Sequence, residues 1–344
     1  MAPLGQVFEV TLENAREYLV ALGQLPAGSP AAIEALGWGI SNMVFKVSLA
    51  NDCFVFKQSL PKLRVKDDWP FDRARILVER DCMALLGQLL PAGSVPAVRF
   101  SDGTNFVFGM SCAPEGGVLW EQALLAQQIH VPTAARAGAL LVEMHLRAAA
   151  DPRVQARFAA QTGFLQGRVD PYYWTAARLH ADLAPLIEAE VQRMLATRLT
   201  LVHGDYSPKN MFVYPERILL LDFEVAHYGD PAFDAAFCLN HLLLPAMAFP
   251  GYAAQYLDAA LAFWHTYHCE PVRQLDPQIE PTTIRALGCL LLARIDGKSK
   301  IPYITDDATR DQVRGVARQI LTGSETSLDA LLVAIRQTIL MEDH

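Results

Sequence analysis

The sequence predicts an α+β fold of two lobes, a small antiparallel-sheet lobe at residues 1–112 and a larger, mostly helical lobe at residues 113–344. Three observations predict it. Strand-like segments joined by Gly and Asp turns lie within the first 112 residues. A linker rich in Pro and Gly, CAPEGG, runs from Cys112 to Gly117, and the chain after it has mostly helical patterns. The 344 residues, 52% of them hydrophobic, are enough for two such lobes.

The first lobe is predicted to begin with a helix and three strands. Thr11 followed by LENAREYLVAL is typical of an N-capped amphipathic helix. The segment IEALGWGISNMVFKV, from Ile33 to Val47, predicts a strand, a turn that contains glycine, and a second strand. A turn at Asn51 and Asp52 then leads into CFVFKQSL, which predicts a third strand.

The rest of the first lobe predicts a loop, a helix and a hairpin. The polar segment SLPKLRVKDDWPFD, from Ser59, is interrupted twice by proline and predicts a loop. FDRARILVERDCMALLGQLL predicts a helix that ends near Gly93. VRFSD and NFVFGM then predict two strands around a turn at Asp102 and Gly103. This order of elements indicates an antiparallel sheet instead of βαβ units.

Two segments of the second lobe are informative. NMFVY and RILLLDF flank Pro215 and Glu216 and predict a hairpin. The segment Ala235–Leu257 has no Asp, Glu, Lys or Arg, but it contains Asn240, His241 and two prolines. A membrane span would rarely contain so many polar and helix-breaking residues. We therefore predict a buried helix, a turn and a second helix.

Composition excludes some classes of protein. A net charge of −8 argues against a nucleic-acid-binding protein, which usually has a basic face. The start of the chain lacks the basic and apolar regions of a signal peptide, so we expect a cytoplasmic protein without a membrane partner. We also expect a monomer or a homodimer. The cysteines show no paired spacing, which predicts free thiols in a reducing compartment. They are Cys53, Cys82, Cys112, Cys238, Cys269 and Cys289.

One short segment concentrates polar groups between apolar runs. LVHGDYSPKNMFVYPERILLLDFE, residues 201–224, contains Asp205, Asn210, Asp222 and Glu224. Buried carboxylates are costly unless a charged partner lies among them. A lysine on a strand, a glutamate on a helix, Asp-x-x-x-x-Asn and a further Asp, in this order, are the arrangement of protein kinases. The predicted partner is therefore Mg²⁺ bound with a nucleotide, since carboxylate and amide oxygens suit this ion.

Three motifs together resemble the aminoglycoside phosphotransferase and choline kinase superfamily of small-molecule kinases: HGDYSPKN, LLLDFE and GDPAFD. The first hundred residues resemble the methylthioribose kinases through GWGISNMVFKV, VFKQSLPKLR and WPFDRARILVERD. That branch has Asp-Pro-Glu where this chain has Asp222-Phe223-Glu224, and it does not keep an asparagine at the position of Asn210. The resemblance therefore implies a protein-kinase-like fold and phosphoryl transfer without determining the acceptor.

The superfamily resemblance implies roles for the matching residues. Asp205 is expected to be the catalytic base, with Asn210 beside it in the motif. Asn210 and Asp222 are expected to hold Mg²⁺, and Glu224 could reach a second ion. The positions expected to bind the nucleotide are Lys57, Glu79, Gly37, Gly39, Met110 and Cys112. The lysine would contact phosphates, its glutamate partner would pair with it, the glycines would admit phosphate oxygens, and the segment Met110–Ala113 would contact adenine through backbone groups.

Several of these positions have structural alternatives. Glu79 has charged neighbours on its predicted helix, so a solvated charge network is possible, and the two glycines could form a plain hairpin turn. We predict that His203 is structural and holds its loop by hydrogen bonds. Asp230 is predicted to cap the following helix, and Asp234 to accept backbone N–H groups of the catalytic loop.

Two further segments are candidates for contact with the phosphoryl acceptor. The candidates are Arg64, Lys66 and Trp69 in the first segment, and Arg294, Lys298 and Lys300 in the second. The first segment could instead be a mobile surface loop. The second could be a helix C-terminus, closed at Gly297, where basic residues oppose the helix dipole.

We therefore expect an ATP- and Mg²⁺-dependent kinase of a small hydroxyl compound. The favoured acceptor is a neutral or anionic polyol or hydroxy compound, such as a sugar like methylthioribose, because cations cluster near Gly297. Two alternatives remain open. One is an aminoglycoside phosphotransferase, and the other is a nucleotide-binding pseudokinase without turnover.

Overall fold

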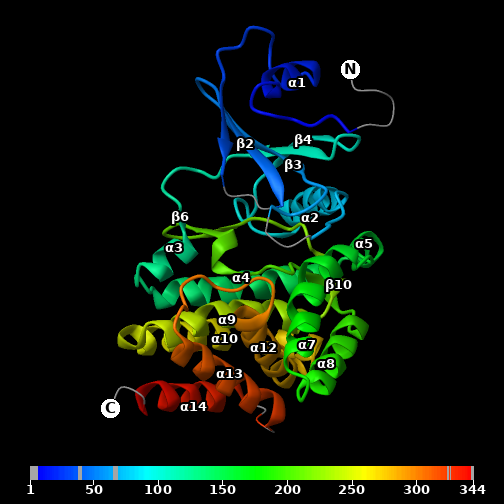
Figure 1. The fold of residues 1–344 in the computed structure, drawn as a ribbon. Helices are drawn as coiled ribbons and strands as arrows, with labels where there is room; N and C mark the ends of the chain where they lie inside the picture. Colours follow the sequence, from blue (N-terminus) through cyan, green and yellow to red (C-terminus); the bar gives the residue numbers. More distant parts are fainter. Residues whose placement is uncertain (1–6, 38–40, 65–68, 324, 326, 342–344) are drawn as a thin grey trace. The chain divides into compact units, whose positions relative to one another are not determined.

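The computed structural model describes residues 7–37, 41–64, 69–323, 325 and 327–341. The chain forms two compact units (Figure 1). Unit 1 comprises Met1–Gly116 and Leu221–Val225, and unit 2 comprises Gly117–Leu220 and Ala226–His344. The segment that carries Asp222 and Glu224 is therefore part of unit 1.

Unit 1 contains a five-stranded antiparallel sheet with the strand order β1-β2-β3-β5-β4 (Figure 1). The strands are β1 (Ala32–Leu36), β2 (Asn42–Ser48), β3 (Cys53–Ser59), β4 (Val98–Asp102) and β5 (Val107–Ser111). All five strands that the sequence predicts for this region are present. Alternation along β3 places Phe54 and Phe56 in the core on one face and Lys57 on the other, because successive side chains point to opposite faces.

Two helices accompany this sheet, α1 (Ala15–Ala21) and α2 (Arg75–Leu89). The apolar side of α1 packs with the core formed by Phe45 and Phe56, and α2 contacts the face that carries Lys57. The predicted N-cap at Thr11 is wrong, because α1 begins at Ala15. The Thr11 amide donates instead to Asn14 Oδ1 at 2.8 Å, which forms a turn ahead of the helix.

The start of α2 also differs from the prediction. Its periodic pattern extends back to Phe71, but the helix begins at Arg75. The Asp72 carboxylate accepts a hydrogen bond from the Ala74 amide at 2.9 Å, and this local turn occupies the residues before the helix.

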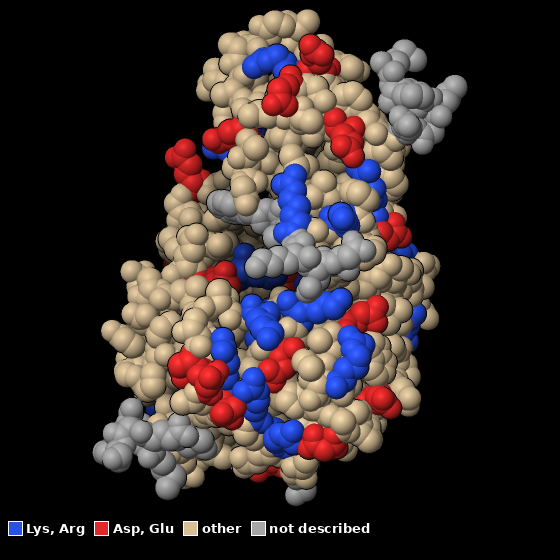
Figure 2. Space-filling model, viewed as in Figure 1, with Lys and Arg blue, Asp and Glu red and all other residues tan. Residues whose placement is uncertain are grey.

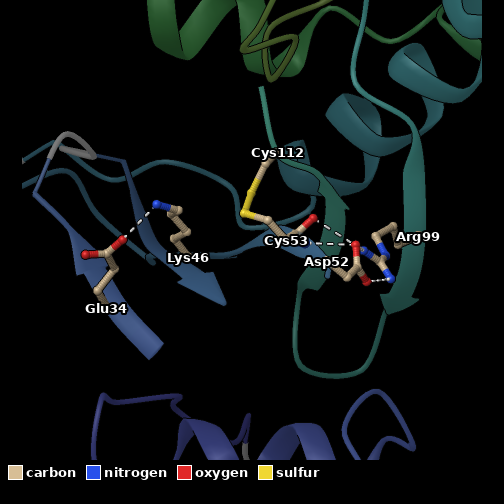
Figure 3. Close-up of a disulfide and its surroundings, with 6 residues drawn as sticks. All are labelled: Glu34, Lys46, Asp52, Cys53, Arg99 and Cys112. Atoms are coloured by element: carbon tan, nitrogen blue, oxygen red, sulfur yellow. Dashed lines mark hydrogen bonds and ion pairs between the residues drawn. A yellow bond between two sulfur atoms is a disulfide. The ribbon is translucent and has the colours of Figure 1, made fainter. Parts of the chain in front are cut away.

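The prediction that all cysteines are free is wrong for Cys53 and Cys112, which form a disulfide (Figure 3). The register of β3 with β5 pairs Phe54 with Ser111, so the next residues along each strand are the two cysteines, with Cα atoms 5.7 Å apart. Their separation of 59 residues in the chain carries no signal of this contact. Nearby, Asp52 and Arg99 form a two-bond ion pair at 2.7 and 2.8 Å (Figure 3).

Reduction of this disulfide is expected to lower the free energy of unfolding by about 2–4 kcal/mol, because the unfolded chain gains the freedom of a long loop. Denaturant unfolding with and without dithiothreitol measures the change. The Cys53→Ser variant is the control, since reductant should leave its stability unchanged. Thiol titration of the unfolded, unreduced chain should detect the four free cysteines, and six reactive thiols would contradict the disulfide.

Unit 2 is built mainly from helices (Figure 1). They are α3 (Trp120–Leu125), α4 (Val131–Ala149), α5 (Pro152–Arg157), α6 (Thr162–Phe164), the π-helical segment η1 (Leu165–Trp174), α7 (Thr175–Leu179), α8 (Ala184–Ala196), the 3₁₀ segment η2 (Pro208–Asn210), α9 (Pro231–Ala248), the 3₁₀ segment η3 (Pro250–Tyr252), α10 (Ala253–Tyr267), α11 (Glu270–Leu275), α12 (Ile279–Asp296), α13 (Asp307–Thr322) and α14 (Leu328–Met341). The short strands are β6 (Val118–Leu119), β7 (Thr200–Val202), β8 (Met211–Val213), β9 (Ile218–Leu220) and β10 (His227–Gly229). β8 and β9 form the predicted hairpin, with β6 added at its edge, and β7 pairs with β10.

The uncharged segment around Asn240 and His241 forms α9, η3 and the start of α10, as predicted. Residues Pro231–Met247 of α9 are all buried, and the helix packs against α10 and α12. A helix that is apolar on every side is typical of a protein core. No helix in the described part of the chain has the length and apolarity needed to cross a membrane.

Charged side chains of both signs are interspersed on the face of unit 2 that carries α7 and α13 (Figure 2). Several of them pair with one another. His180 and Arg314 both contact the Asp296 carboxylate, at 2.9 and 2.7 Å, and Arg318 binds Asp182. The cations in these pairs therefore have acidic partners, unlike those of a basic nucleic-acid-binding face.

Candidate active site

The loop after β7 is fixed by a buried carboxylate. Asp234, on α9, accepts hydrogen bonds from the amides of His203 and Gly204 at 2.7 and 2.8 Å. Gly204 has φ +76°, a conformation that favours glycine. The His203 Nδ1 atom accepts from the Asp205 amide at 3.2 Å. The predicted contacts of Asp234 and His203 with the backbone of this loop are therefore confirmed.

The other predicted structural carboxylate, Asp230, caps α9. Its Oδ1 accepts a hydrogen bond from the Ala232 amide at 3.0 Å, and its Oδ2 lies 2.6 Å from the Arg193 guanidinium. Burial raises the pKa of Asp230 to about 6, although the charge of Arg193 opposes this change. The prediction of a cap at Asp230 is confirmed.

Asp205 is held by two cations. Its Oδ2 lies 2.8 Å from Arg168 Nη2 and 2.8 Å from Lys209 Nζ, and the residue is only 3% exposed. Its Oδ1 is buried and has no hydrogen-bond partner among the described residues. Burial alone would raise the pKa of Asp205, but the charges of Arg168 and Lys209 hold it well below its usual range. The result is an ionised carboxylate with one oxygen fixed and the other available.

Asn210 closes the same loop from η2. Its Nδ2 donates to the Asp205 carbonyl oxygen at 3.0 Å, and the residue is 6% exposed. This bond uses the amide nitrogen, so the side-chain oxygen is the atom that remains for a cation. An amide oxygen is a hard ligand of the kind that Mg²⁺ accepts.

Arg168 and Lys209 were not found by sequence reasoning. Arg168 lies in η1, an irregular segment with Pro171 inside it and no periodic pattern that marks a functional position. Its Nε also donates to the Gly204 carbonyl at 2.7 Å, so one guanidinium holds two successive loop residues. Lys209 could have been found, since it follows Asp205 by four residues within HGDYSPKN.

In unit 1, the predicted ion pair between Lys57 and Glu79 is present. Lys57 Nζ lies 2.6 Å from Glu79 Oε1 and 3.5 Å from Asp222 Oδ1. Burial alone would lower the pKa of Lys57, but the carboxylates of Glu79 and Asp222 raise it above its usual value. Burial also raises the pKa of Glu79 to about 7. The pair is held away from water, with the lysine charged.

Three carboxylates in unit 1 lie close enough together to hold a metal ion. One oxygen from each of Glu79, Asp222 and Glu224 lies within 4.8 Å of the others. Asp222 has φ +69°, a left-handed conformation that Asp and Asn tolerate better than most residues. Lys57 offsets part of the negative charge. Three carboxylates near this lysine form an oxygen-rich donor set that fits Mg²⁺.

Glu224 is oriented by Arg75, another residue whose role was not predicted. Arg75 Nε lies 3.2 Å from Glu224 Oε2, and Asn42 Nδ2 donates to the same oxygen at 3.0 Å. Arg75 is 2% exposed and donates to the carbonyl oxygens of Phe71 and other residues of the preceding loop. A solvated charge network is therefore wrong for Glu79 and Arg75, since both are buried.

The remaining predicted nucleotide positions lie around the sheet. Gly37 follows β1 in a turn and has open space where a side chain would be, whereas Gly39 lies outside the described residues. Met110 is buried on β5 and is paired with Val55, and Cys112 is bonded to Cys53. Contact of their backbone groups with adenine stays a prediction.

Two of the residues predicted to contact the acceptor, Arg64 and Trp69, contact other side chains of unit 1. Arg64 is exposed and contacts the Met43 sulfur. Trp69 packs against a small apolar cluster of Leu63, Phe71 and Val225. Lys66 lies outside the described residues. A role for Arg64 and Trp69 in acceptor binding stays a prediction.

The second candidate segment forms the predicted end of α12 at Gly297, whose amide donates to the Ala293 carbonyl at 2.8 Å. Arg294 is half-buried, and its Nη1 donates to the Ser299 carbonyl at 2.6 Å and lies 3.4 Å from Tyr172 Oη. Lys298 and Lys300 are exposed. Arg294 is therefore oriented by contacts within unit 2.

Comparison with known proteins places these residues in a family context. A model of a phosphotransferase enzyme family matches residues 32–269. The methylthioribose kinase of Geobacillus sp. (strain WCH70) is 22% identical over 343 residues, covering 85% of this chain and 84% of that protein. That of Yersinia enterocolitica is 24% identical over 319 residues, covering 81% and 79%.

Solved structures share the fold. An amicoumacin kinase in complex with AMP-PNP, Ca²⁺ and Ami superimposes with a TM-score of 0.56 at 13% identity, covering 91% of this chain and 95% of that one. A Plasmodium vivax ethanolamine kinase superimposes with a TM-score of 0.56 at 12% identity, covering 95% and 88%. The predicted α+β, two-lobed, protein-kinase-like fold is confirmed.

Proposed function

The chain belongs to the phosphotransferase enzyme family, and from this premise we propose that it transfers the γ-phosphoryl group of ATP to a hydroxyl of a small polyol or hydroxy compound. The observation that carries the proposal is Asp205, a buried ionised carboxylate with one oxygen held by two cations and the other unpaired. Such a group can accept the proton of an attacking hydroxyl. The methylthioribose kinases among the relatives support a sugar or similar polyol as the acceptor.

In this proposal Asp205 acts as the general base. Its Oδ1 accepts a hydrogen bond from the acceptor hydroxyl and takes the proton as the hydroxyl oxygen bonds to the γ-phosphorus. The bond between that phosphorus and the bridging oxygen of ADP breaks in the same displacement. Because Arg168 and Lys209 fix the other carboxylate oxygen, the base is oriented before the acceptor arrives.

The remaining residues hold the nucleotide. Lys57, charged and paired with Glu79, would bind phosphate oxygens of ATP. Asn210 and Asp222 would hold Mg²⁺, which when bound neutralises negative charge on the phosphates. Glu224, oriented by Arg75, would support the ion from the same carboxylate cluster.

A positioning role for Arg168 can be separated from a purely structural role by the pH dependence of the rate. The Arg168→Gln variant removes a positive charge beside Asp205, so the pKa of this carboxylate should rise by about 1–3 units. Asp205 works as a base only when ionised, so the rate falls as the pH drops through its pKa. In the wild type this limb lies below about pH 4, because the pKa of Asp205 is held well below its usual range. The acid limb of kcat/KM should therefore move to higher pH in Arg168→Gln, measured from pH 3 to 8.

The matched control for this experiment is Arg168→Lys, which keeps the charge and should keep the acid limb near its original position. A loss of rate in Arg168→Gln that is equal at every pH would contradict the electrostatic role and leave only a structural one.

The alternatives have less support. A pseudokinase usually lacks at least one of the key groups, whereas this chain keeps Lys57, Asp205, Asn210 and Asp222. An aminoglycoside is a polycation, and the cations Arg168, Lys209 and Arg294 in unit 2 disfavour it.

The function is tested by an ATP-consumption screen with mass detection of the phosphorylated product. The acceptors are methylthioribose, ribitol, ribose 5-phosphate, glycerate, ethanolamine, choline and kanamycin, each with and without Mg²⁺, and Asp205→Asn is the blank. We expect Mg²⁺-dependent product with a neutral or anionic hydroxy compound. A best rate with kanamycin would favour the antibiotic alternative. The same assay is run with anionic, neutral and cationic fractions of a metabolite extract. ATP consumption that equals the blank with every acceptor and every fraction would contradict turnover.

A further inference from the structure

Three cations meet around one buried tyrosine in unit 2. The guanidinium carbons of Arg168 and Arg294 lie 5.6 and 6.0 Å from the ring centre of Tyr172. Arg294 Nη1 is also 3.4 Å from the Tyr172 hydroxyl oxygen. Lys209 and Arg168 both contact Asp205. Lys209 Nζ and Arg168 Nη2 each lie 2.8 Å from Asp205 Oδ2. The three side chains come from η1, η2 and α12, which are far apart in the chain.

Two carboxyl groups interact with these cations. Asp205 is one counter-charge. Glu121, half-buried on α3, interacts electrostatically with Lys209 and Arg294, but burial raises its pKa above the usual value. His241 lies in the same field, and burial together with Arg294 and Lys209 holds its pKa well below the usual range, so it is neutral. Arg294 and Lys209 therefore lie near a neutral histidine and a carboxyl group whose pKa is raised by burial.

Several buried polar atoms at this cluster have no partner among the described residues. They are Asp205 Oδ1, Arg294 Nε and the Nε2 atom of His241, a residue that is only 5% exposed. Buried polar groups are normally paired, and a group without a partner calls for an explanation, such as a catalytic role or a bound water or ion. The electrostatic potential at Tyr172 is positive. Burial alone would raise the pKa of Tyr172, but the charges of Arg294 and Arg168 lower it below its usual value.

We infer that the acceptor carries, besides its hydroxyl, an anionic group, a carboxylate or a phosphate monoester, which binds at the cluster of Arg294, Lys209 and His241. This inference rests on the proposed kinase function. A guanidinium offers a fork of donors that matches both oxyanions, and a neutral histidine nitrogen can donate a further hydrogen bond. With the anion bound, the hydroxyl would reach the unpaired Oδ1 of Asp205, and the anion would face the charges of Arg294 and Lys209.

The charge of the acceptor can be measured before its identity is known. A nucleotide-free extract of cell metabolites is separated by ion exchange at pH 7 into anionic, neutral and cationic fractions. Each fraction is the probe, incubated with the enzyme, Mg²⁺ and γ-labelled ATP, and label in new products is compared with the Asp205→Asn blank. We expect transfer in the anionic fraction to exceed that in the other two at least tenfold.

Phosphatase treatment of the anionic fraction beforehand separates the two sources of the anion. Transfer that is lost identifies a phosphate monoester, and transfer that survives identifies a carboxylate. Transfer mainly in the neutral or cationic fraction would overturn the inference and leave the kinase assignment intact. No transfer in any fraction would overturn both.

Variants test the site itself, with the active fraction as the varied substrate. Arg294→Gln should raise the apparent KM for the acceptor at least tenfold, while the KM for ATP stays within a factor of about 2. Arg294→Lys keeps the positive charge, so its KM for the acceptor should be close to that of the wild type. This result would show that Arg294→Gln weakens acceptor binding and does not misfold the protein. Arg310→Gln is the control and should change neither value, since Arg310 on α13 is only partly buried and pairs with the exposed Asp307. Equal increases in both KM values would mean that the cations serve the nucleotide, and would overturn the inference.

Discussion

Replacing Asp205 by asparagine is expected to lower kcat by a factor on the order of 10²–10⁴, because the variant keeps the shape of the side chain but cannot accept the proton. Binding of ATP should be nearly unchanged, since the predicted phosphate and metal contacts belong to other residues. The near-isosteric amide is preferred to alanine, because alanine would leave Arg168 and Lys209 without any oxygen partner.

Single-turnover measurements with saturating acceptor separate the chemical step from product release, and a thermal-shift titration with ATP reports nucleotide binding. Asp182→Asn is the matched control, since Asp182 lies in the same unit but forms an exposed pair with Arg318. If Asp205→Asn keeps a chemical rate within a factor of a few of the wild type, Asp205 is not the base.

Much of the fold was predictable because its signals are local. The strands of unit 1 alternate apolar residues between turn residues, and all five are present, although β5 begins at Val107 and not at the predicted Asn105. The buried helix α9 was also predictable. An uncharged segment with scattered polar residues fits a helix in the core of a protein better than a membrane span. The errors at Thr11 and Phe71 concern helix ends, where a side-chain hydrogen bond ahead of the first turn competes with the helix.

The candidate site was predictable only where its residues are close together in the chain. Asp205 and Asn210 share one motif, and the structure joins them by a hydrogen bond across five residues. Arg168 reaches Asp205 from an irregular segment 37 positions earlier, and Arg75 reaches Glu224 across 149 positions. A single sequence carries no signal for such long-range ion pairs, because an arginine has the same local pattern whether it is solvated or buried.

The disulfide illustrates the same limit. Cys53 and Cys112 become neighbours only through the register of β3 with β5, which is set by packing of the whole sheet. Similarly, Leu221–Val225 follows a hairpin of unit 2 in sequence but belongs to unit 1, where Val225 packs with Leu63 and Phe71. The pairing of Glu224 with Arg75 depends on that placement.

Replacing Asp222 by asparagine is expected to abolish the Mg²⁺-dependent part of nucleotide binding, because the ion loses a carboxylate ligand and gains only a neutral amide. Asparagine tolerates the left-handed backbone found at Asp222, whereas alanine would add strain, so the change isolates the charge. In the wild type, Mg·ATP at 100 times its Kd should add about 2.7 kcal/mol to the free energy of unfolding, since it binds only the folded state.

That increment should be absent in Asp222→Asn, and the small stabilisation by ATP in EDTA should be similar in the two proteins, because Lys57 keeps its pairing with Glu79 at 2.6 Å. Thermal unfolding of each protein with ATP, with Mg·ATP and without nucleotide measures the difference. Asp52→Asn is the control, since this exposed carboxylate of unit 1 pairs with Arg99 and lies outside the carboxylate cluster. A variant that is stabilised by Mg·ATP as strongly as the wild type would remove Asp222 from the metal site. The pairing of Asp222 with Lys57, at 3.5 Å, would then be its remaining role.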